Sequence, residues 1–118
     1  MSLDLTTAGA NAVVDYLINT GTRYLGLATD AALTEVTDGA YSRQNLNAAC
    51  PAAASGAVAN TSTIAFDTGA QTATHWFIID ASSGAGTLGK IISGRLPTPI
   101  TGAYTFAVGE FTLDAVGA

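Results

Sequence analysis

The spacing of apolar residues changes once along the chain, from a helical period near the amino terminus to a strand period further on. In the first segment, apolar residues recur three and four positions apart, at Ala10, Val13, Val14, Leu17 and Ile18. That spacing gathers them on one helix face about 100° wide. Thr6 or Thr7 supplies a capping hydroxyl, and Asn19 to Gly21 supplies residues that end helices. The pattern predicts a helix over about residues 7–19 that lies on a sheet.

After the helix, apolar and polar residues alternate. RYLGLAT, STIAFDT and TFAVGEFTLDAV alternate in this way. HWFIIDA is apolar without interruption, as in a strand covered on both faces, and we expect its second cover to be the helix or a neighbouring subunit. SSGAG and LGKIISGRL complete a hairpin over residues 74–96.

Three segments between these strands read as turns or loops. Asp38-Gly39 is a turn signal between two short strand-like pieces. NAACPAAASGAVAN, residues 47–60, has no period and is predicted to be a loop. PTPITGAY is predicted to be a connection, because Pro97 and Pro99 carry no N–H group for a sheet ladder.

The number and spacing of the strands predict a mainly β protein. We expect a β-sandwich of about six to seven short antiparallel strands over residues 22–116, with one short N-terminal α-helix. A chain of 118 residues forms one domain, here residues 1–118. The predicted core combines one helix face with the inward strand positions: Val13, Val14, Leu17, Leu25, Leu27, Ile64, Phe66, Phe77, Ile79, Phe106, Phe111 and Leu113.

Charge and hydropathy exclude two classes of partner. Nine acidic and four basic residues give a net charge of −5, and the Lys and Arg residues are scattered, which argues against nucleic acid. No apolar run approaches the roughly 20 residues of a membrane span, and the amino terminus does not resemble a signal peptide. Only 11% of residues are charged, so we expect partners to cover part of the surface.

Residues suited to catalysis or metal binding are few. His75 is the only histidine, and Asp80, five positions further along the strand, is expected to face the other side. We expect His75 to have a packing role and Asp80 to accept hydrogen bonds from N–H groups two residues on. The single cysteine, Cys50, is expected to be a buried small hydrophobe.

Ion and phosphate sites are also disfavoured by spacing. Asp30, Glu35 and Asp38 are the nearest approach to a calcium loop, but they lack the DxDxDG pattern, so solvated turn carboxylates are preferred. The stretch around GAGTLGKI fails the phosphate-loop pattern at Ile91 and is followed by a strand rather than a helix. No metal or cofactor is expected.

Four motifs in order resemble a family of small tailed-phage virion proteins, variously called tail-fibre or head-decoration proteins. They are YLGLATD, TEVTDGAYSRQ, ATHWFIIDASSGAGTL and GEFTLD, and the resemblance runs from about Thr7 to Asp114. The chain departs from the family pattern in having Ala40 where a second glycine is commoner, and in its Ala-rich middle loop.

The resemblance implies a non-enzymatic structural protein of the virion, made in the cytoplasm of the bacterial host. One possibility is a capsid decoration or cement protein that binds the major capsid protein on the outer head shell. The other is a tail-fibre, collar or receptor-binding module that contacts tail proteins. The sequence shows no shaft, coiled coil or repeat, which favours decoration. A homo-oligomer, most simply a trimer, is implied because decoration proteins commonly occupy threefold positions.

Five residues are candidates for contacts with those partners: Trp76, Arg95, Lys90, Tyr41 and Arg43. Trp76 begins the apolar strand, and Arg95 and Lys90 lie on the strand that returns from its turn. A solvated strand face is the alternative for Lys90. Tyr41 and Arg43 belong to the second of the four motifs. No catalytic, metal-binding or cofactor-binding residue is assigned.

Overall fold

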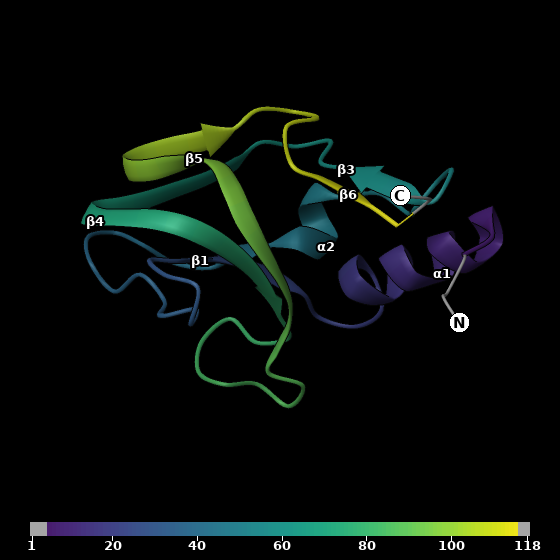
Figure 1. The fold of residues 1–118 in the computed structure, drawn as a ribbon, viewed down its shortest axis with the longest axis horizontal. Helices are drawn as coiled ribbons and strands as arrows, with labels where there is room; N and C mark the ends of the chain where they lie inside the picture. Colours follow the sequence, from purple (N-terminus) through teal and green to yellow (C-terminus); the bar gives the residue numbers. More distant parts are fainter. Residues whose placement is uncertain (1–4, 116–118) are drawn as a thin grey trace.

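The computed structural model describes residues 5–115 and is mainly β, as predicted, with two antiparallel sheets. Its elements follow the order α1 (Thr7–Ile18), β1 (Tyr24–Ala28), β2 (Gln44–Asn45), α2 (Leu46–Ala49), β3 (Ala57–Ala59), β4 (Ile64–Ile79), β5 (Lys90–Phe106) and β6 (Thr112–Asp114). A four-stranded sheet has the order β2-β1-β4-β5, and β3 pairs with β6 in a second, smaller sheet. Figure 1 shows the curved β4–β5 hairpin, with α1 and the β3–β6 pair toward one end of the molecule.

Helix α1 begins and ends where its caps predict. The Thr6 hydroxyl accepts a hydrogen bond from the Gly9 N–H at 3.0 Å, and the helix ends at Ile18. Ala10, Val14 and Ile18 are buried at spacings of four, and Leu17 is half-buried. The prediction for Val13 was wrong, because its side chain is 40% exposed. The helix packs on the two-stranded β3–β6 sheet. A sheet this narrow covers a smaller part of the helix surface than a broad sheet would.

Strand β4 joins two segments that the sequence presents separately. Most of STIAFDT and of HWFIIDA lies in one strand, and the register with β5 shifts between Asp67 and Thr72. Gly69 at this irregularity has φ +62°, which glycine adopts without strain. The chain therefore bends within the strand instead of leaving the sheet. Strands β4 and β5, of 16 and 17 residues, are longer than the short strands that the sequence predicts.

The predicted connection at PTPITGAY is part of β5. Proline is tolerated there because β5 is an edge strand, whose outer side has no partner that needs an N–H group. The predicted loop over residues 47–60 likewise contains most of α2 and all of β3. Asn45 starts α2 by accepting a hydrogen bond from the Ala48 N–H at 3.0 Å.

The closing alternating segment is two strands rather than one. Strand β5 ends at Phe106, a turn follows, and β6 begins at Thr112. Buried Asn60 holds this turn: it accepts a hydrogen bond from the Phe111 N–H at 2.9 Å, and its Nδ2 donates to the Ala107 carbonyl at 3.0 Å. Phe111 remains buried, as predicted.

The two faces of the large sheet carry cores of different size. The main core includes the predicted residues Val14, Leu25, Leu27, Ile64, Phe66, Phe106 and Phe111, with Leu17 and Leu113 half-buried against it. Phe77, Ile79 and Ala28 form a smaller core on the opposite face, with Tyr24 and Leu33 packed against them. The cover over Phe77 is therefore the segment after β1, which carries Leu33, and not α1.

Candidate functional site

A groove of about 280 Å³ opens beside the middle and the end of β5 and the turn before β6. Its walls include four aromatic side chains, Trp76, Tyr104, Phe106 and Phe111, together with Pro97 and Pro99. Glu110 lines it and supplies a negative charge, and Arg95 also borders it. Arg95 pairs with His75 while Gly94 pairs with Trp76, so the Arg95 side chain projects from the other face of the sheet. The groove thus combines apolar walls with a few polar groups, as small-ligand and contact sites commonly do.

Trp76 is held in the groove by a close contact with the backbone of β5. Gly94 lies opposite it in the β4–β5 register, and a Cβ at position 94 would stand 2.6 Å from three atoms of the indole ring. Phe111 meets the indole edge to face, with ring centroids 5.7 Å apart. Glycine is therefore required at position 94 for this placement of the ring.

Tyr104 and Glu110 form a polar pair in the groove. The Tyr104 hydroxyl donates to Glu110 Oε2, and the Ala107 N–H donates to Glu110 Oε1 at 2.8 Å. These two hydrogen bonds, that of Tyr104 first, lower the pKa of Glu110, and the same contact with Glu110 raises the pKa of Tyr104. Glu110 is thus a carboxylate near neutral pH, and its position also fixes the turn after β5.

A second polar cluster lies on the other face of the sheet, around Glu35. Arg43 donates to both Glu35 carboxylate oxygens at 2.8 Å, and the Tyr41 hydroxyl donates to Glu35 Oε2 at 2.6 Å. Burial alone would raise the pKa of Glu35, but the hydrogen bonds from Arg43 and Tyr41 outweigh it, so the pKa is lowered.

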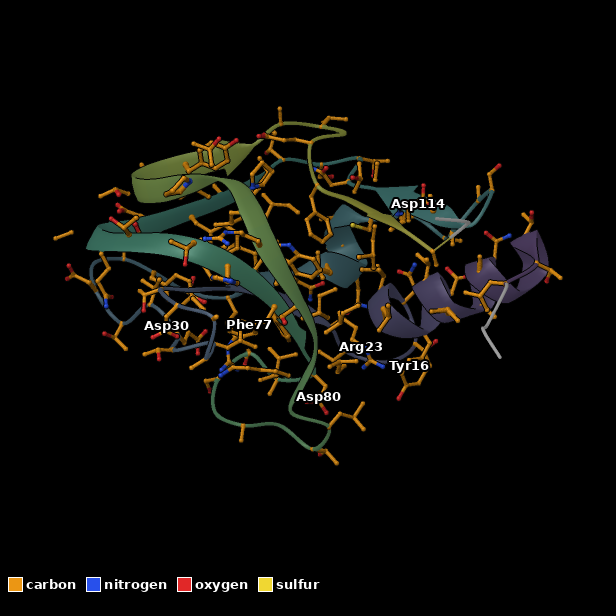
Figure 2. All side chains as sticks on the ribbon, viewed as in Figure 1. Tyr16, Arg23, Asp30, Phe77, Asp80 and Asp114 are labelled. Atoms are coloured by element: carbon orange, nitrogen blue, oxygen red, sulfur yellow. The ribbon has the colours of Figure 1, made fainter. Side chains whose placement is uncertain are left out.

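The same cluster joins two loops. Arg43 Nη1 donates to the Ala81 carbonyl at 2.8 Å, so the segment after β1 is tied to the β4–β5 loop. Lys90 Nζ donates to the Leu33 carbonyl at 2.9 Å and lies 5.0 Å from the centroid of the Phe77 ring. Figure 2 labels Phe77 on β4.

The five contact candidates consequently fall into two groups. Trp76 lines the groove and Arg95 borders it, whereas Tyr41, Arg43 and Lys90 lie in the cluster around Glu35 and Phe77. The second group already has hydrogen-bond partners within the fold. The role of all five in contacts with other proteins stays a prediction.

His75 and Asp80 have separate partners. His75 Nδ1 is 2.8 Å from the Thr74 hydroxyl. Asp80 Oδ2 accepts hydrogen bonds from the Thr87 and Leu88 N–H groups at 3.1 and 2.9 Å. The predicted acceptor role of Asp80 is correct in kind, but its donors lie at the far end of the loop rather than two residues on. These bonds, with that of Leu88 the stronger influence, lower the pKa of Asp80.

The three carboxylates weighed for calcium do not converge. Asp30 accepts from the Thr34 N–H at 3.0 Å, Glu35 binds Arg43, and Asp38 accepts from the Ala70 N–H at 2.9 Å. Within residues 5–115, no three His, Cys, Asp or Glu side chains are grouped as metal ligands would be. Cys50 is buried, and burial raises the pKa of its thiol to about 11.

Sequence reasoning missed Tyr104, Glu110 and Asn60. The alternation of Tyr104 with Phe106 was visible, but a predicted connection over PTPITGAY separated Tyr104 from the final strand. Nothing in the sequence indicated that Glu110 would turn back onto Tyr104 or that Asn60 would hold a distant turn, because both contacts depend on the split between β5 and β6.

Comparison with known proteins agrees with the resemblance seen in the sequence. Among the described residues, no helix is both long and apolar enough to cross a bilayer. No curated protein matches the chain. The family model described as Podophage GP4 fiber I protein gp80 matches residues 5–113. Because this match covers most of the 118 residues, the chain belongs to the Gp80 family of podophage fibre proteins.

Proposed function

We propose that the chain is a non-enzymatic structural component of a podophage fibre and acts through surface contacts. The observation that carries this proposal is the family match over residues 5–113. The sequence alone favoured decoration of the head shell, whereas the description of the matching family favours the fibre, which was the alternative.

The geometry supports a structural role. The side chains that general acid–base or nucleophilic chemistry would use have structural partners: Asp80 holds a loop, Glu35 an ion pair, and Glu110 a turn. The hydrogen-bond partner of His75 is the Thr74 hydroxyl, and Asp30 interacts with His75 through charge without a hydrogen bond between them. A working acid–base pair needs its two members within hydrogen-bond reach.

Capsid decoration remains the second candidate because of the shape of the described chain. It measures 42 × 29 × 26 Å, and its elements form one compact body rather than a repeating shaft. A compact body of this kind suits a clip on a shell as well as a module mounted on a longer fibre protein.

Labelling of intact particles separates the two locations. Antibody raised against the purified protein, coupled to gold, is expected to decorate the tail region in electron micrographs. Particles from a phage deleted for the gene serve as the control for antibody specificity, and label should return when the protein is supplied from a plasmid. Label distributed over the head shell would contradict the fibre proposal and favour decoration.

A further inference from the structure

We propose that the solvent-facing side of α1 packs against the same side of α1 in a neighbouring copy of this chain. The inference assigns an interaction surface, and it goes beyond the fibre role because it does not depend on where the protein lies in the virion. Helix α1 stands at one end of the molecule, away from the β4–β5 hairpin, so a second copy can reach it (Figure 1).

The polar side chains of α1 are directed into the fold. Asn11 Oδ1 accepts a hydrogen bond from the Gly56 N–H at 2.7 Å, and Asp15 Oδ1 accepts one from the Ala53 N–H at 2.7 Å. Asn11 and Asp15 are four positions apart and so lie on one stripe of the helix. The stripe that would normally face water is thus used to hold the segment before β3.

The side of α1 that faces solvent is apolar instead. Ala8, Ala12, Val13 and Tyr16 are all exposed, Val13 by 40% and Tyr16 by 47%. Leu5, just before the helix cap, is exposed by 43%. The opposite face of α1 is buried in the fold, so the helix is apolar on two sides. Helices of this kind are normally covered on both sides.

These side chains form a patch rather than a scatter. Of the five large apolar side chains that are exposed among residues 5–115, three are Leu5, Val13 and Tyr16. Single exposed apolar residues are common on protein surfaces, but several on one element indicate a contact surface. Small residues beside them, Ala8 and Ala12, allow another helix to approach closely.

Tyr16 is held in place from below. The Arg23 side chain is buried, its guanidinium lies 5.2 Å from the centroid of the Tyr16 ring, and its Nε donates to the Tyr16 carbonyl at 3.2 Å (Figure 2). An ordered tyrosine loses little conformational freedom when a partner covers it. Tyrosine is also among the residues that contribute most to protein interfaces.

Charge favours a second copy as the partner. The chain has a net charge of −5, so two copies repel each other overall. In a symmetric contact the same surface meets itself, and any charge on that surface would add to the repulsion. Asp15 is the only charged residue from Thr7 to Ile18, and it is turned toward Ala53. The apolar side of α1 therefore matches itself, and it offers no charge to steer a different, charged partner.

Cysteine cross-linking tests the contact directly. Cys50, the single cysteine, is buried, so a cysteine introduced by Ala12→Cys is the accessible thiol. Under mild oxidation Ala12→Cys is expected to form disulfide-linked copies. Thr7→Cys is the matched control, exposed on the same helix but turned about 140° away from Ala12. It is expected to cross-link roughly tenfold more slowly, because its thiols are not held together.

Charge variants test the same contact without chemistry at cysteine. Val13→Asp places like charges across the contact and is expected to weaken self-association about tenfold or more in sedimentation velocity. Thr7→Asp adds the same charge to the same helix outside the patch, at the first turn, where an acidic residue is tolerated. Its association is expected to stay within about twofold of the parent. Circular dichroism melting checks that both variants fold.

Three results would overturn the proposal. The first is equal cross-linking rates for Ala12→Cys and Thr7→Cys. The second is equal self-association of folded Val13→Asp and Thr7→Asp. The third is a parent that stays monomeric while its α1 patch binds another virion protein or a lipid vesicle, with binding lost in Val13→Asp. All three use purified protein, so they are independent of where the label falls on intact particles.

Discussion

Two glycines of β1 and β5 allow aromatic side chains to lie against the backbone of a neighbouring strand. Gly26 is opposite Phe77, and Gly94 is opposite Trp76. A Cβ at position 26 would stand 2.3 Å from Phe77 Cζ, a distance that atoms cannot share. The requirement at these positions is for space, not for an unusual backbone angle.

Replacement of Gly26 by Ala is therefore expected to displace the Phe77 ring from the smaller core. Overpacking of this kind costs typically about 1–3 kcal/mol, and urea unfolding followed by circular dichroism measures it. The Gly26→Ala change should cost less in a Phe77→Leu background, because the clashing ring is gone. Equal costs in the two backgrounds would show that the ring is not responsible.

Glu35 makes the stability of the protein depend on pH. Its folded-state pKa lies below the usual 4.5, so the folded form binds this proton less readily than the unfolded chain. The stabilisation is thus present above about pH 4.5 and is lost as the pH falls through the folded-state pKa. Acidification is expected to weaken the ion pair between Arg43 and Glu35.

Glu35→Gln tests this dependence. The variant is expected to be less stable than the parent near neutral pH, and its melting temperature should fall less steeply on acidification. Tyr41→Phe removes one of the hydrogen bonds to Glu35 and should give an intermediate slope, although it also removes the acceptor of the Leu27 N–H. Parallel curves for the parent and Glu35→Gln would exclude Glu35 as the source.

The loop between β4 and β5 is organised by one carboxylate. Asp80 accepts the Thr87 and Leu88 N–H groups, so it closes the loop from its first residue to its last turn. Asp80→Ala is expected to speed hydrogen exchange at Thr87 and Leu88 while leaving the amides of β1 protected. Asp80→Asn retains one acceptor oxygen, so its exchange rates at Thr87 and Leu88 should lie between those of the parent and those of Asp80→Ala. Uniformly faster exchange would mean that the loop supports the whole sheet.

Element by element, the sequence predicted what local pattern controls and missed what distant pairing controls. The caps and spacing of α1 are local, and the helix was located correctly apart from the exposure of Val13. Strand β3 was assigned to a loop because its Ala-rich sequence has no period, and it is a strand only because β6 pairs with it. The prolines of β5 were misread because edge position is a property of the sheet, not of the segment.

The candidate site was predictable only in part for the same reason. Trp76 and Arg95 were singled out from the hairpin, whose two strands are adjacent in sequence. Their neighbours Phe111 and Glu110 reach the groove from the turn before β6. That turn exists because Asn60 holds it, and no local pattern links Asn60 to Phe111.

For the molecule as a whole, we expect self-association, most simply as a trimer. One reason is the small number of charged residues, 11% of the chain. Another is that Leu88 and Val108 are large apolar side chains exposed by 52% and 63%. Sedimentation velocity over a range of concentrations measures the mass in solution. A monomer both in solution and in assembled particles, seen by averaging of micrographs, would refute this expectation.

Strand β4 pairs with β5, which follows it in the sequence, and with β1, which is distant in the sequence. This difference implies an order of folding. The pairing of β4 with β5 can extend outward from the loop that Asp80 closes, so each new contact joins residues already brought close. Its other neighbour, β1, must bring Tyr24 to Ile79 across the intervening chain, a far larger loop to close. The hairpin is thus expected to form before β1 adds to it, and until then its Phe77 side remains exposed to neighbouring unfolded copies during synthesis.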